Sequence, residues 1–232
     1  MSGKAEVMIL CAGNGTRLGD LTLDTPKVML PVAGKPALQW TIESLARQGI
    51  RRVVINLCRL ADMVTYHFGD GSRFGLEIRY SLEETLLGTA GGIKRALPML
   101  ADSFRIILGD VLSDIPLACV HSPADITLAA HVRPRPWECG CLVLDGNQVV
   151  AIHEKPSMND VQNPLVFAGV ARLTRQAVRD FPPYTDDLMG EALPLIMPRY
   201  RMQAVCLPRE MRIQDIGTPE GYQRAQELWR AA

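Results

Sequence analysis

The chain of 232 residues has no excess of charge of either sign, because 25 Lys and Arg residues balance 25 Asp and Glu residues. Proteins that bind nucleic acid over a broad surface normally present a basic face, which this composition does not supply. If the chain binds a polyanion, a few local cations must do so. No apolar run approaches the ~20 residues that span a bilayer. The composition therefore predicts a globular protein with neither nucleic acid nor membrane among its partners.

The sequence also shows neither a secretory signal nor the cysteine spacing of a disulfide framework. In the first segment, MSGKAEVMILCAG, a glycine-rich polar loop follows the short apolar stretch at once, which is unlike a signal peptide. The six cysteines are therefore expected to be reduced thiols, and we predict a cytoplasmic protein. Cys139 and Cys141 form C-x-C with no second pair or His at zinc-ligand spacing, so a structural zinc site is not expected.

No linker, internal repeat or low-complexity segment divides the chain, so a single domain over residues 1–232 is expected. Short apolar runs alternate with helix-period segments up to residue 108. This alternation predicts a Rossmann-like, doubly wound α/β fold with a mixed, mostly parallel sheet and helices on both faces. Later strand-like runs predict antiparallel or mixed strands in the same sheet. The expected strands are 7–11, 53–56, 76–80, 105–108, 126–132, 141–144, 149–153, 166–173 and 202–207, and the expected helices are 36–49, 60–68, 89–97 and 219–230.

A glycine-rich loop with cations follows the first apolar run, in LCAGNGTRLGDLTLDTPKVMLPVAGKP, from Leu10 to Pro36. It lacks the Walker A string G-x-x-x-x-G-K-[ST]. It also departs from the dinucleotide fingerprint G-x-G-x-x-G, because Leu18 stands in the third glycine's place. Lys35 stands where an acid that binds the ribose is expected. A dinucleotide-binding oxidoreductase is therefore disfavoured.

What the loop retains is a pattern for binding phosphate. Gly13 and Gly15 let the backbone approach a phosphate closely and point N–H groups at it. Arg17 adds a forked guanidinium, and Lys27 adds a compact second cation. Two cations that face one polyphosphate suit a displacement at phosphorus in which diphosphate leaves. Each residue alone could be a solvated surface charge, and their grouping with the glycines favours a functional role.

The same segment resembles the signature of the sugar-1-phosphate nucleotidyltransferases, also called NDP-sugar pyrophosphorylases. The family pattern is an apolar strand, then A-G-x-G-T-R-L, then P-K-x-x-x-P-V-x-G-K-P. The segments FGDGSRFGLEIRY, LGTAGGI, LGDV, EKP and DIGTPEGYQRAQ agree in the same order, from about Val7 to Gln226. The resemblance implies an enzyme that joins a nucleoside triphosphate to a sugar 1-phosphate and releases diphosphate. It also implies Mg²⁺ as cofactor, a nucleotide-binding half of about residues 1–115, a sugar-phosphate-binding half of about 116–232, and a homo-oligomer, since relatives are often dimers or larger.

Individual roles follow from the resemblance. As catalytic residues, Arg17 would hold the leaving diphosphate and Lys27 the triphosphate. Asp110 and Asp215 would ligate the metal, since Mg²⁺ prefers hard oxygen ligands. The implied sugar-phosphate-binding residues are Gly140, Glu154, Lys155 and Gly169. The implied nucleotide-binding residues are Leu10, Ala12, Gly13, Gly15, Thr16, Arg17, Glu83, Gly88 and Thr89.

Two positions depart from the family pattern. An aromatic residue usually precedes the second aspartate, where this chain has Gln214. The family often has Asn-Ala-Gly where this chain has Phe167, Ala168 and Gly169, so an amide that contacts the sugar is missing there and the sugar can differ from glucose.

The nucleobase and the sugar stay open. Glu83 stands where the family reads the base, and an acceptor-only carboxylate suits the donors of guanine better than uracil or thymine. The chain is most similar to short guanylyltransferases that act on heptose or mannose 1-phosphates, so GTP is favoured. A UTP- or dTTP-dependent enzyme is the alternative. A second alternative is a non-catalytic relative that binds a nucleotide sugar. This alternative is disfavoured, because the charged residues that the family uses in catalysis are all present.

Overall fold

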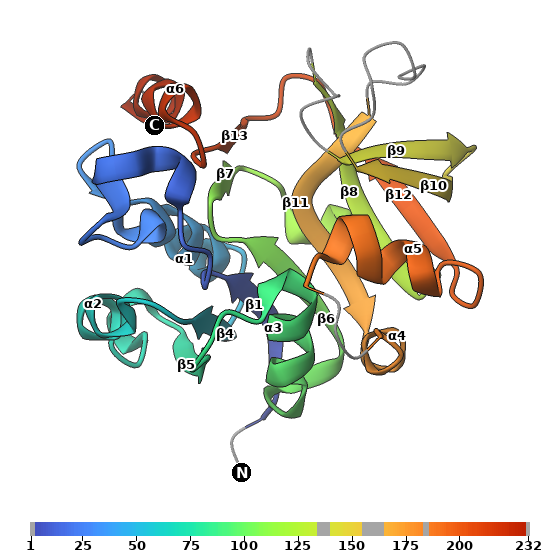
Figure 1. Cartoon of the computed structure of the whole chain (residues 1–232), viewed down its shortest axis with the longest axis horizontal. Coiled ribbons are helices and arrows are strands. Elements are labelled where there is room, and N and C mark those ends of the chain that lie inside the picture. The colour runs from blue at the N-terminus through green and yellow to red at the C-terminus, as the bar shows by residue number, and fades with distance from the viewer. Residues whose placement is uncertain (1–2, 134–139, 155–164, 183–185, 231–232) are drawn as a thin grey trace.

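The computed structural model describes residues 3–133, 140–154, 165–182 and 186–230. Within these ranges nine strands form one sheet in the order β5-β4-β1-β6-β11-β8-β12-β10-β9 (Figure 1). The strands of this sheet are β1 (Ala5–Leu10), β4 (Arg52–Leu57), β5 (Glu77–Leu82), β6 (Leu100–Leu108), β8 (Ile126–Val132), β9 (Gly140–Asp145), β10 (Gln148–Glu154), β11 (Leu165–Thr174) and β12 (Met202–Cys206). All nine contain or overlap strands that the apolar runs predict.

The first half of the sheet is parallel. Strand β1 pairs in parallel with β4 and with β6, and β4 pairs in parallel with β5. The carboxyl ends of these strands therefore meet at one edge, which is where open α/β sheets bind ligands. The helices that connect these strands are α1 (Ala37–Arg47), α2 (Ala61–Phe68) and α3 (Gly88–Ala96).

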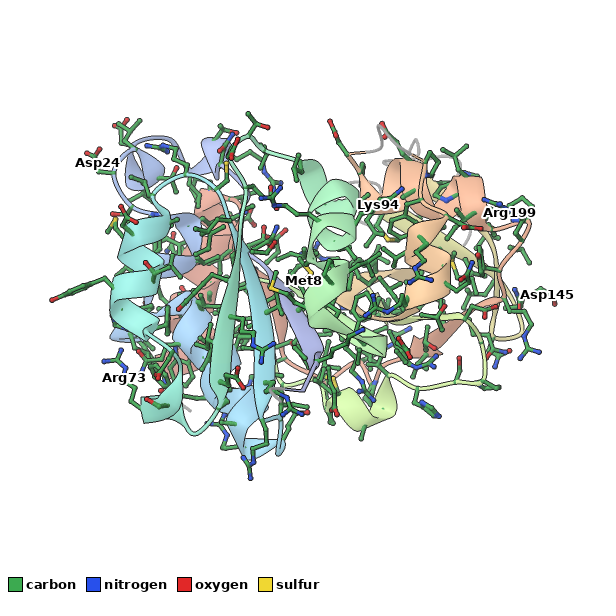
Figure 2. All side chains as sticks on the ribbon, turned by 90° about the horizontal axis from the view of Figure 1, so that it is seen from below. Met8, Asp24, Arg73, Lys94, Asp145 and Arg199 are labelled. Atoms are coloured by element: carbon green, nitrogen blue, oxygen red, sulfur yellow. The ribbon has the colours of Figure 1, made fainter. Side chains whose placement is uncertain are left out.

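Helices cover both faces of this parallel part, as expected. Side chains of β1 alternate between two buried clusters: Val7 and Ile9 pack with residues of α1 and α2, and Met8 and Leu10 pack with residues of α3. Figure 2 shows Met8 in the interior, while Asp24 and Arg199 lie at the periphery. The period-2 pattern of one strand thus fills two cores, which is why its apolar run is nearly continuous.

The second half is largely antiparallel and closes on itself. Strand β11 pairs antiparallel with β6 and β8, and it also pairs with β9 at Val166 and Cys141. Five strands, β11, β8, β12, β10 and β9, thus form a barrel-like ring. The register of β11 shifts between Phe167 and Ala171, around Gly169 with φ of 80°. Such a bulge bends a strand and lets it serve two neighbours. The sheet is mixed, as predicted, but the prediction that it is mostly parallel is wrong. Its second half is largely antiparallel, because β9 and β10 form a hairpin and β11 runs antiparallel to β6, β8 and β9.

Several short elements escaped sequence prediction because they span too few residues to show a period. Strands β7 (Val111–Ser113) and β13 (Ile213–Asp215) form an antiparallel pair, and β2 (Pro31–Val32) pairs with β3 (Lys35–Pro36). The 3₁₀ segments are Thr16–Thr22, Lys27–Met29, Ser72–Phe74, Leu97–Met99 and Leu117–Cys119. The remaining helices are α4 (Arg175–Arg179), a π-helix (Leu188–Ala192), α5 (Leu193–Ile196) and α6 (Pro219–Arg230).

The C-terminal helix α6 matches its predicted range and packs Ala225 and Trp229 into a third buried cluster with Val32 and Leu112. This cluster holds the β2–β3 segment and β7 against the end of the chain. In the described residues, we find no helix that combines the length and the apolar character needed to cross a membrane.

Candidate active site

The loop after β1 takes its shape from one left-handed glycine. Gly15 has φ of 68°, and a Cβ there would lie 3.2 Å from Lys27 Cβ and 3.1 Å from Thr22 Cγ2. The Thr22 hydroxyl donates to the Gly15 carbonyl oxygen at 3.0 Å. Glycine thus lets the loop press against the segment that carries Lys27. At Gly13 a Cβ would meet no atom within 4 Å, so its backbone faces open space.

Lys27 forms an ion pair with Asp110 at the end of β6. Its Nζ lies 2.5 Å from Asp110 Oδ2, and the two side chains are only 11% and 21% exposed. The backbone N–H of Gly109 donates to the Leu10 carbonyl oxygen at 2.9 Å, which fixes the turn after β6 beside the end of β1. Asp110 therefore stands at the carboxyl edge of the parallel strands, next to the glycine loop.

Asp215 reaches the same place through the short β7–β13 pair, in which it stands opposite Val111. Burial raises the pKa of the Asp215 carboxyl, and the neighbouring Asp110 carboxylate raises it further. Its Oδ1 accepts from the Gly217 N–H at 2.5 Å. A Cβ on Gly217 would lie 2.7 Å from Arg17 Nη2 and 2.8 Å from Asp215 Oδ1, so Arg17 and Asp215 converge on this glycine.

These contacts bring four sequence-predicted residues together: Arg17, Lys27, Asp110 and Asp215. The two carboxylates repel each other, as the raised pKa of Asp215 indicates, and a cation between them would relieve that repulsion. No cluster of three or more His, Cys, Asp or Glu residues suited to a metal is present in the described part of the chain. Two aspartates nevertheless fit Mg²⁺, which binds through one or two carboxylates, substrate phosphates and waters.

A smaller pocket, with a volume of about 240 Å³, lies beside the glycine loop. Leu108 and Asp110 line it at one side, and Gly88 and Thr89 line it at the start of α3. Six of the residues implied to bind nucleotide or phosphate contribute to its wall. The lining residues are Leu10, Cys11, Ala12, Gly13, Lys27, Val28, Asn56, Leu86, Gly88, Thr89, Leu108 and Asp110.

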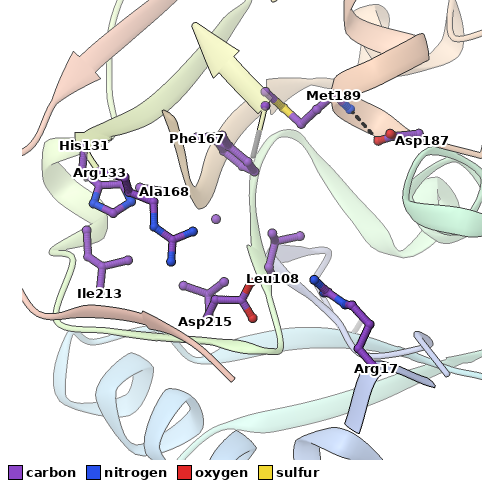
Figure 3. A pocket seen from close by; sticks show the side chains of 13 residues that line it. Arg17, Leu108, His131, Arg133, Phe167, Ala168, Asp187, Met189, Ile213 and Asp215 are labelled. Atoms are coloured by element: carbon purple, nitrogen blue, oxygen red, sulfur yellow. Dashed lines mark hydrogen bonds between the residues drawn. The ribbon is translucent and has the colours of Figure 1, made fainter. Parts of the chain in front are cut away.

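A larger pocket of about 410 Å³ adjoins it, and Leu108 lines both. Figure 3 shows Arg17 and Arg133 on opposite sides of this space, with Leu108 and Asp215 between them. The lining residues are Arg17, Leu108, Val111, His131, Arg133, Gly140, Phe167, Ala168, Gly169, Asp187, Met189, Ile213 and Asp215. Gly140 and Gly169, which the resemblance implies as sugar-phosphate-binding residues, are both among these lining residues. A Cβ on Gly169 would lie 3.1 Å from Val111 Cβ.

Besides Glu83, which is described below, four of the implied site residues lie outside both linings or cannot be placed. Glu154 ends β10 opposite Gly140, and its side chain and Lys155 fall outside the described residues. Gly15 and Thr16 line neither pocket and instead shape the loop and begin the 3₁₀ segment that carries Arg17.

Glu83, the implied reader of the base, lies outside both linings and is only 5% exposed. Its Oε1 accepts from Asn56 Nδ2 at 2.8 Å, and its Oε2 accepts from the Leu87 N–H at 3.1 Å. Asn56 Oδ1 in turn accepts from the Cys11 N–H at 2.9 Å. This buried network links the ends of β1, β4 and β5 to the segment before α3.

Sequence reasoning missed several pocket residues. Asn56 is a buried amide within the apolar run VVINL, and a polar residue in such a run is a signal that could have identified it. His131 and Arg133 follow the apolar part of β8 and have no local motif. Burial, and the adjacent Arg133 charge, lower the pKa of His131 to about 4, so its imidazole is neutral at pH 7.

Cys11 lines the smaller pocket but is not arranged as a nucleophile. Burial and the Asp110 carboxylate raise the pKa of its thiol well above the ordinary range. The reactive form of cysteine is the thiolate. The arrangement therefore favours chemistry by charge neutralisation and positioning over covalent catalysis by this residue.

Several known proteins are similar to this chain in sequence or in fold. The D-glycero-alpha-D-manno-heptose 1-phosphate guanylyltransferase of Campylobacter jejuni is 30% identical over 94% of this chain and 96% of its own length. The N-acetylmuramate alpha-1-phosphate uridylyltransferase of Neisseria meningitidis is 41% identical over 57% of this chain and 58% of its own length. The crystal structure of HddC from Yersinia pseudotuberculosis, complexed with GMP-PN, superimposes with a TM-score of 0.81, at 25% identity over 97% of this chain and 99% of that one.

The matches with three of the curated relatives, the Neisseria protein included, span 55% to 63% of the relatives' own length. The family model for nucleotidyl transferases matches residues 6–231, which takes in both pockets and every described residue that lines them. The chain therefore belongs to the nucleotidyl transferase family.

Proposed function

We propose that this protein joins a nucleoside triphosphate to a sugar 1-phosphate and releases diphosphate. The observation that carries the proposal is that the two pockets adjoin at Leu108, where Arg17, Lys27, Asp110 and Asp215 gather. The smaller pocket would take the nucleotide and the larger one the sugar 1-phosphate. The phosphates of the two substrates would then meet at the shared boundary.

In this reaction an oxygen of the sugar phosphate attacks the α-phosphorus of the nucleotide. The new bond is P–O–P, and the bond from the α-phosphorus to the β-phosphate oxygen breaks, so that diphosphate leaves. A phosphate nucleophile is already ionised at neutral pH, so no general base is needed. Arg17 would neutralise charge on the departing diphosphate, and Lys27 would contact the triphosphate. Holding both reactants in line supplies much of the remaining rate.

Mg²⁺ would be held by Asp110 and Asp215 and would supply charge neutralisation at the phosphates. Lys27 contacts Asp110 in the structure, so its ammonium already lies where charge balance is needed. On binding a triphosphate, Lys27 can share its three N–H donors between that carboxylate and a phosphate oxygen.

We favour GTP as the nucleotide and a heptose- or mannose-type 1-phosphate as the acceptor. The similarity to a heptose 1-phosphate guanylyltransferase over almost all of both chains supports this choice. A uridylyl or thymidylyl transfer is the second candidate. It is favoured by the 41% identity to a uridylyltransferase and by Glu83, whose two oxygens already accept from Asn56 and Leu87.

The two pockets are lined mainly by different halves of the chain. Every residue that lines the smaller pocket falls between Leu10 and Asp110, in the nucleotide-binding half of about residues 1–115. Most of the larger pocket comes from the half of about 116–232. A cytoplasmic location and a homo-oligomeric state complete the proposal, as expected from the cysteine usage and from the resemblance.

The test is diphosphate release with Mg²⁺, with GTP, UTP, dTTP, ATP and CTP each combined with a panel of hexose and heptose 1-phosphates. Release with GTP alone would support the guanylyl assignment. Release with UTP or dTTP alone would overturn that assignment and keep the reaction class. If no pair reacts while nucleotide still binds in calorimetry, the protein is a binding relative and the proposed enzyme is wrong.

A further inference from the structure

The first turn of α3 is bonded to a segment from the other half of the chain. The Thr89 hydroxyl donates to the Asp186 carbonyl oxygen at 3.2 Å and accepts from the Leu188 N–H at 2.8 Å. The Ala90 N–H donates to the same Asp186 oxygen at 3.1 Å. Three hydrogen bonds thus join residues 89–90 to residues 186–188, and one side chain makes two of them.

The neighbouring glycine allows this contact. Gly88 has φ of 68°, and a Cβ there would lie 2.3 Å from the Asp186 oxygen and 2.6 Å from its Cα. No side chain fits in that space, so the two backbones touch directly. The contact therefore depends on Gly88 for its closeness and on Thr89 for its hydrogen bonds.

Each side of this contact lines a different pocket. Gly88 and Thr89 line the smaller pocket, and Asp187 and Met189 line the larger one. Asp187 Oδ1 accepts from the Met189 N–H at 3.0 Å (Figure 3). The Asp187 carbonyl oxygen accepts from the Ala192 N–H at 2.9 Å. Residues 186–192 are thus internally bonded, so a displacement at Asp186 would carry Asp187 and Met189 with it.

We infer that Thr89 is a positioning residue for the sugar 1-phosphate, because its hydroxyl fixes the Asp187–Met189 wall of the larger pocket against the nucleotide pocket. The Thr89 hydroxyl donates its single proton to the Asp186 carbonyl oxygen and accepts from the Leu188 N–H with a lone pair. Leu188 is 2% exposed, so the loss of the hydroxyl leaves a donor without a partner in the interior. Moving the segment to satisfy that donor would displace the wall that faces the sugar. This inference rests on the proposed function.

The experiment compares Thr89→Val, which keeps the shape and removes the hydroxyl, with Thr89→Ser, which keeps the hydroxyl. A matched control is Thr65→Val, since the Thr65 hydroxyl donates to the Asp62 carbonyl oxygen on the exposed side of α2. KM values for both substrates are measured on the pair that the wild type uses in the diphosphate-release panel. We expect Thr89→Val to raise the KM of the sugar 1-phosphate about tenfold, because small displacements of positioning groups have large effects. The KM of the nucleotide should rise much less than that of the sugar 1-phosphate, because the Thr89 hydroxyl is bonded to Asp186 and Leu188. Both KM values of Thr65→Val should stay within about twofold of the wild type.

Thr89→Ser should recover most of the lost affinity for the sugar 1-phosphate. If Thr89→Val raises the nucleotide KM instead, Thr89 only binds nucleotide and the inference is wrong. Equal sugar KM values for wild type and Thr89→Val would also overturn it, while leaving the proposed function intact. If Thr89→Val does not fold by circular dichroism, Thr89→Ala removes the hydroxyl without added bulk and decides the question. No turnover by the wild type on any pair would overturn the proposed function and this inference with it.

Discussion

The two pockets are built in different ways, although they share Leu108. The smaller pocket takes all its lining residues from one stretch, Leu10 to Asp110, at the carboxyl ends of parallel strands. Gly13 of the glycine loop and Gly88 at the start of α3 contribute backbone alone to its wall. The larger pocket collects residues from β8, β9, β11, β13 and the segment around Asp187, which lie far apart in the sequence.

Under the proposed function, the difference between the two linings follows from the ligand that each pocket would bind. Phosphate groups are the same in every nucleotide, and closely spaced backbone N–H groups with one or two cations bind them. Such a site can be encoded in a short motif. A sugar offers hydroxyl groups at many angles, so its wall has to be assembled from whichever strands surround it. Substitutions that affect one pocket and spare the other can therefore test the comparison.

Arg17 lines the larger pocket and lies close to Asp215, and its loss should have the largest effect. We expect Arg17→Ala to lower kcat/KM by about 10³-fold, because removal of a charge that stabilises the transferring phosphoryl group has effects of this size. The fold should be unchanged by circular dichroism. Arg51→Ala, at an exposed arginine before β4, is the control and should stay within about twofold of the wild type. Comparable losses in both variants would contradict a special role for Arg17.

Asp110 should come next, because it belongs to the proposed metal-binding pair. Asp110→Asn is expected to lower turnover about 10²-fold and to raise the Mg²⁺ concentration needed for half-maximal rate. A chelator should abolish the activity of the wild type. Asp114→Asn is a matched control: Asp114 lies only four residues away, and its Oδ2 accepts from Arg212 Nε at 2.5 Å near the surface. An unchanged Mg²⁺ requirement in Asp110→Asn would rule out the proposed ligand.

Gly169 tests the larger pocket alone. Gly169→Ala should raise the KM of the sugar 1-phosphate about tenfold and leave the nucleotide KM nearly unchanged, because the new methyl group has to displace Val111 or the bulge of β11. Gly146→Ala controls for the unfavourable φ, since Gly146 also has a positive φ of 59° but a Cβ there meets nothing within 4 Å. If both variants behave alike in kinetics, backbone strain and not the pocket wall explains the effect.

Substitution of His131 should have the smallest effect of the four, and the effect should be on the stability of the fold. Its pKa is lowered to about 4 by burial and by Arg133, below the ordinary value of 6.5 that applies in the unfolded chain. The unfolded state therefore binds the extra proton first, and the free energy of unfolding should fall as the pH drops from about 6.5 towards 4. Urea denaturation at several pH values should show a shallower fall for His131→Asn. If the free energy of unfolding depends on pH equally in the wild type and in His131→Asn, His131 does not contribute to this dependence.

The chain order of strands and helices could be predicted from the sequence, because the period of the apolar residues is a local property. The same holds for the glycine loop with Arg17 and Lys27, whose parts lie within one short segment. Elements of three or four residues, such as β7 and β13, could not be predicted in this way. Strand β6 also begins five residues before its predicted start, because pairing with β1 and β11 extends it beyond its apolar core.

Local patterns in the sequence therefore suffice to predict an α/β fold and a glycine-rich loop that carries two cations, since both depend on neighbours along the chain. Tertiary structure alone decided that Asp215 would lie beside Asp110, that β11 would close a ring with β9, and that Thr89 would bond to residues 186–188. Each of these contacts joins distant segments whose pairing depends on the packing around them. Their free energy comes from burial and hydrogen bonding that exist only in the folded chain.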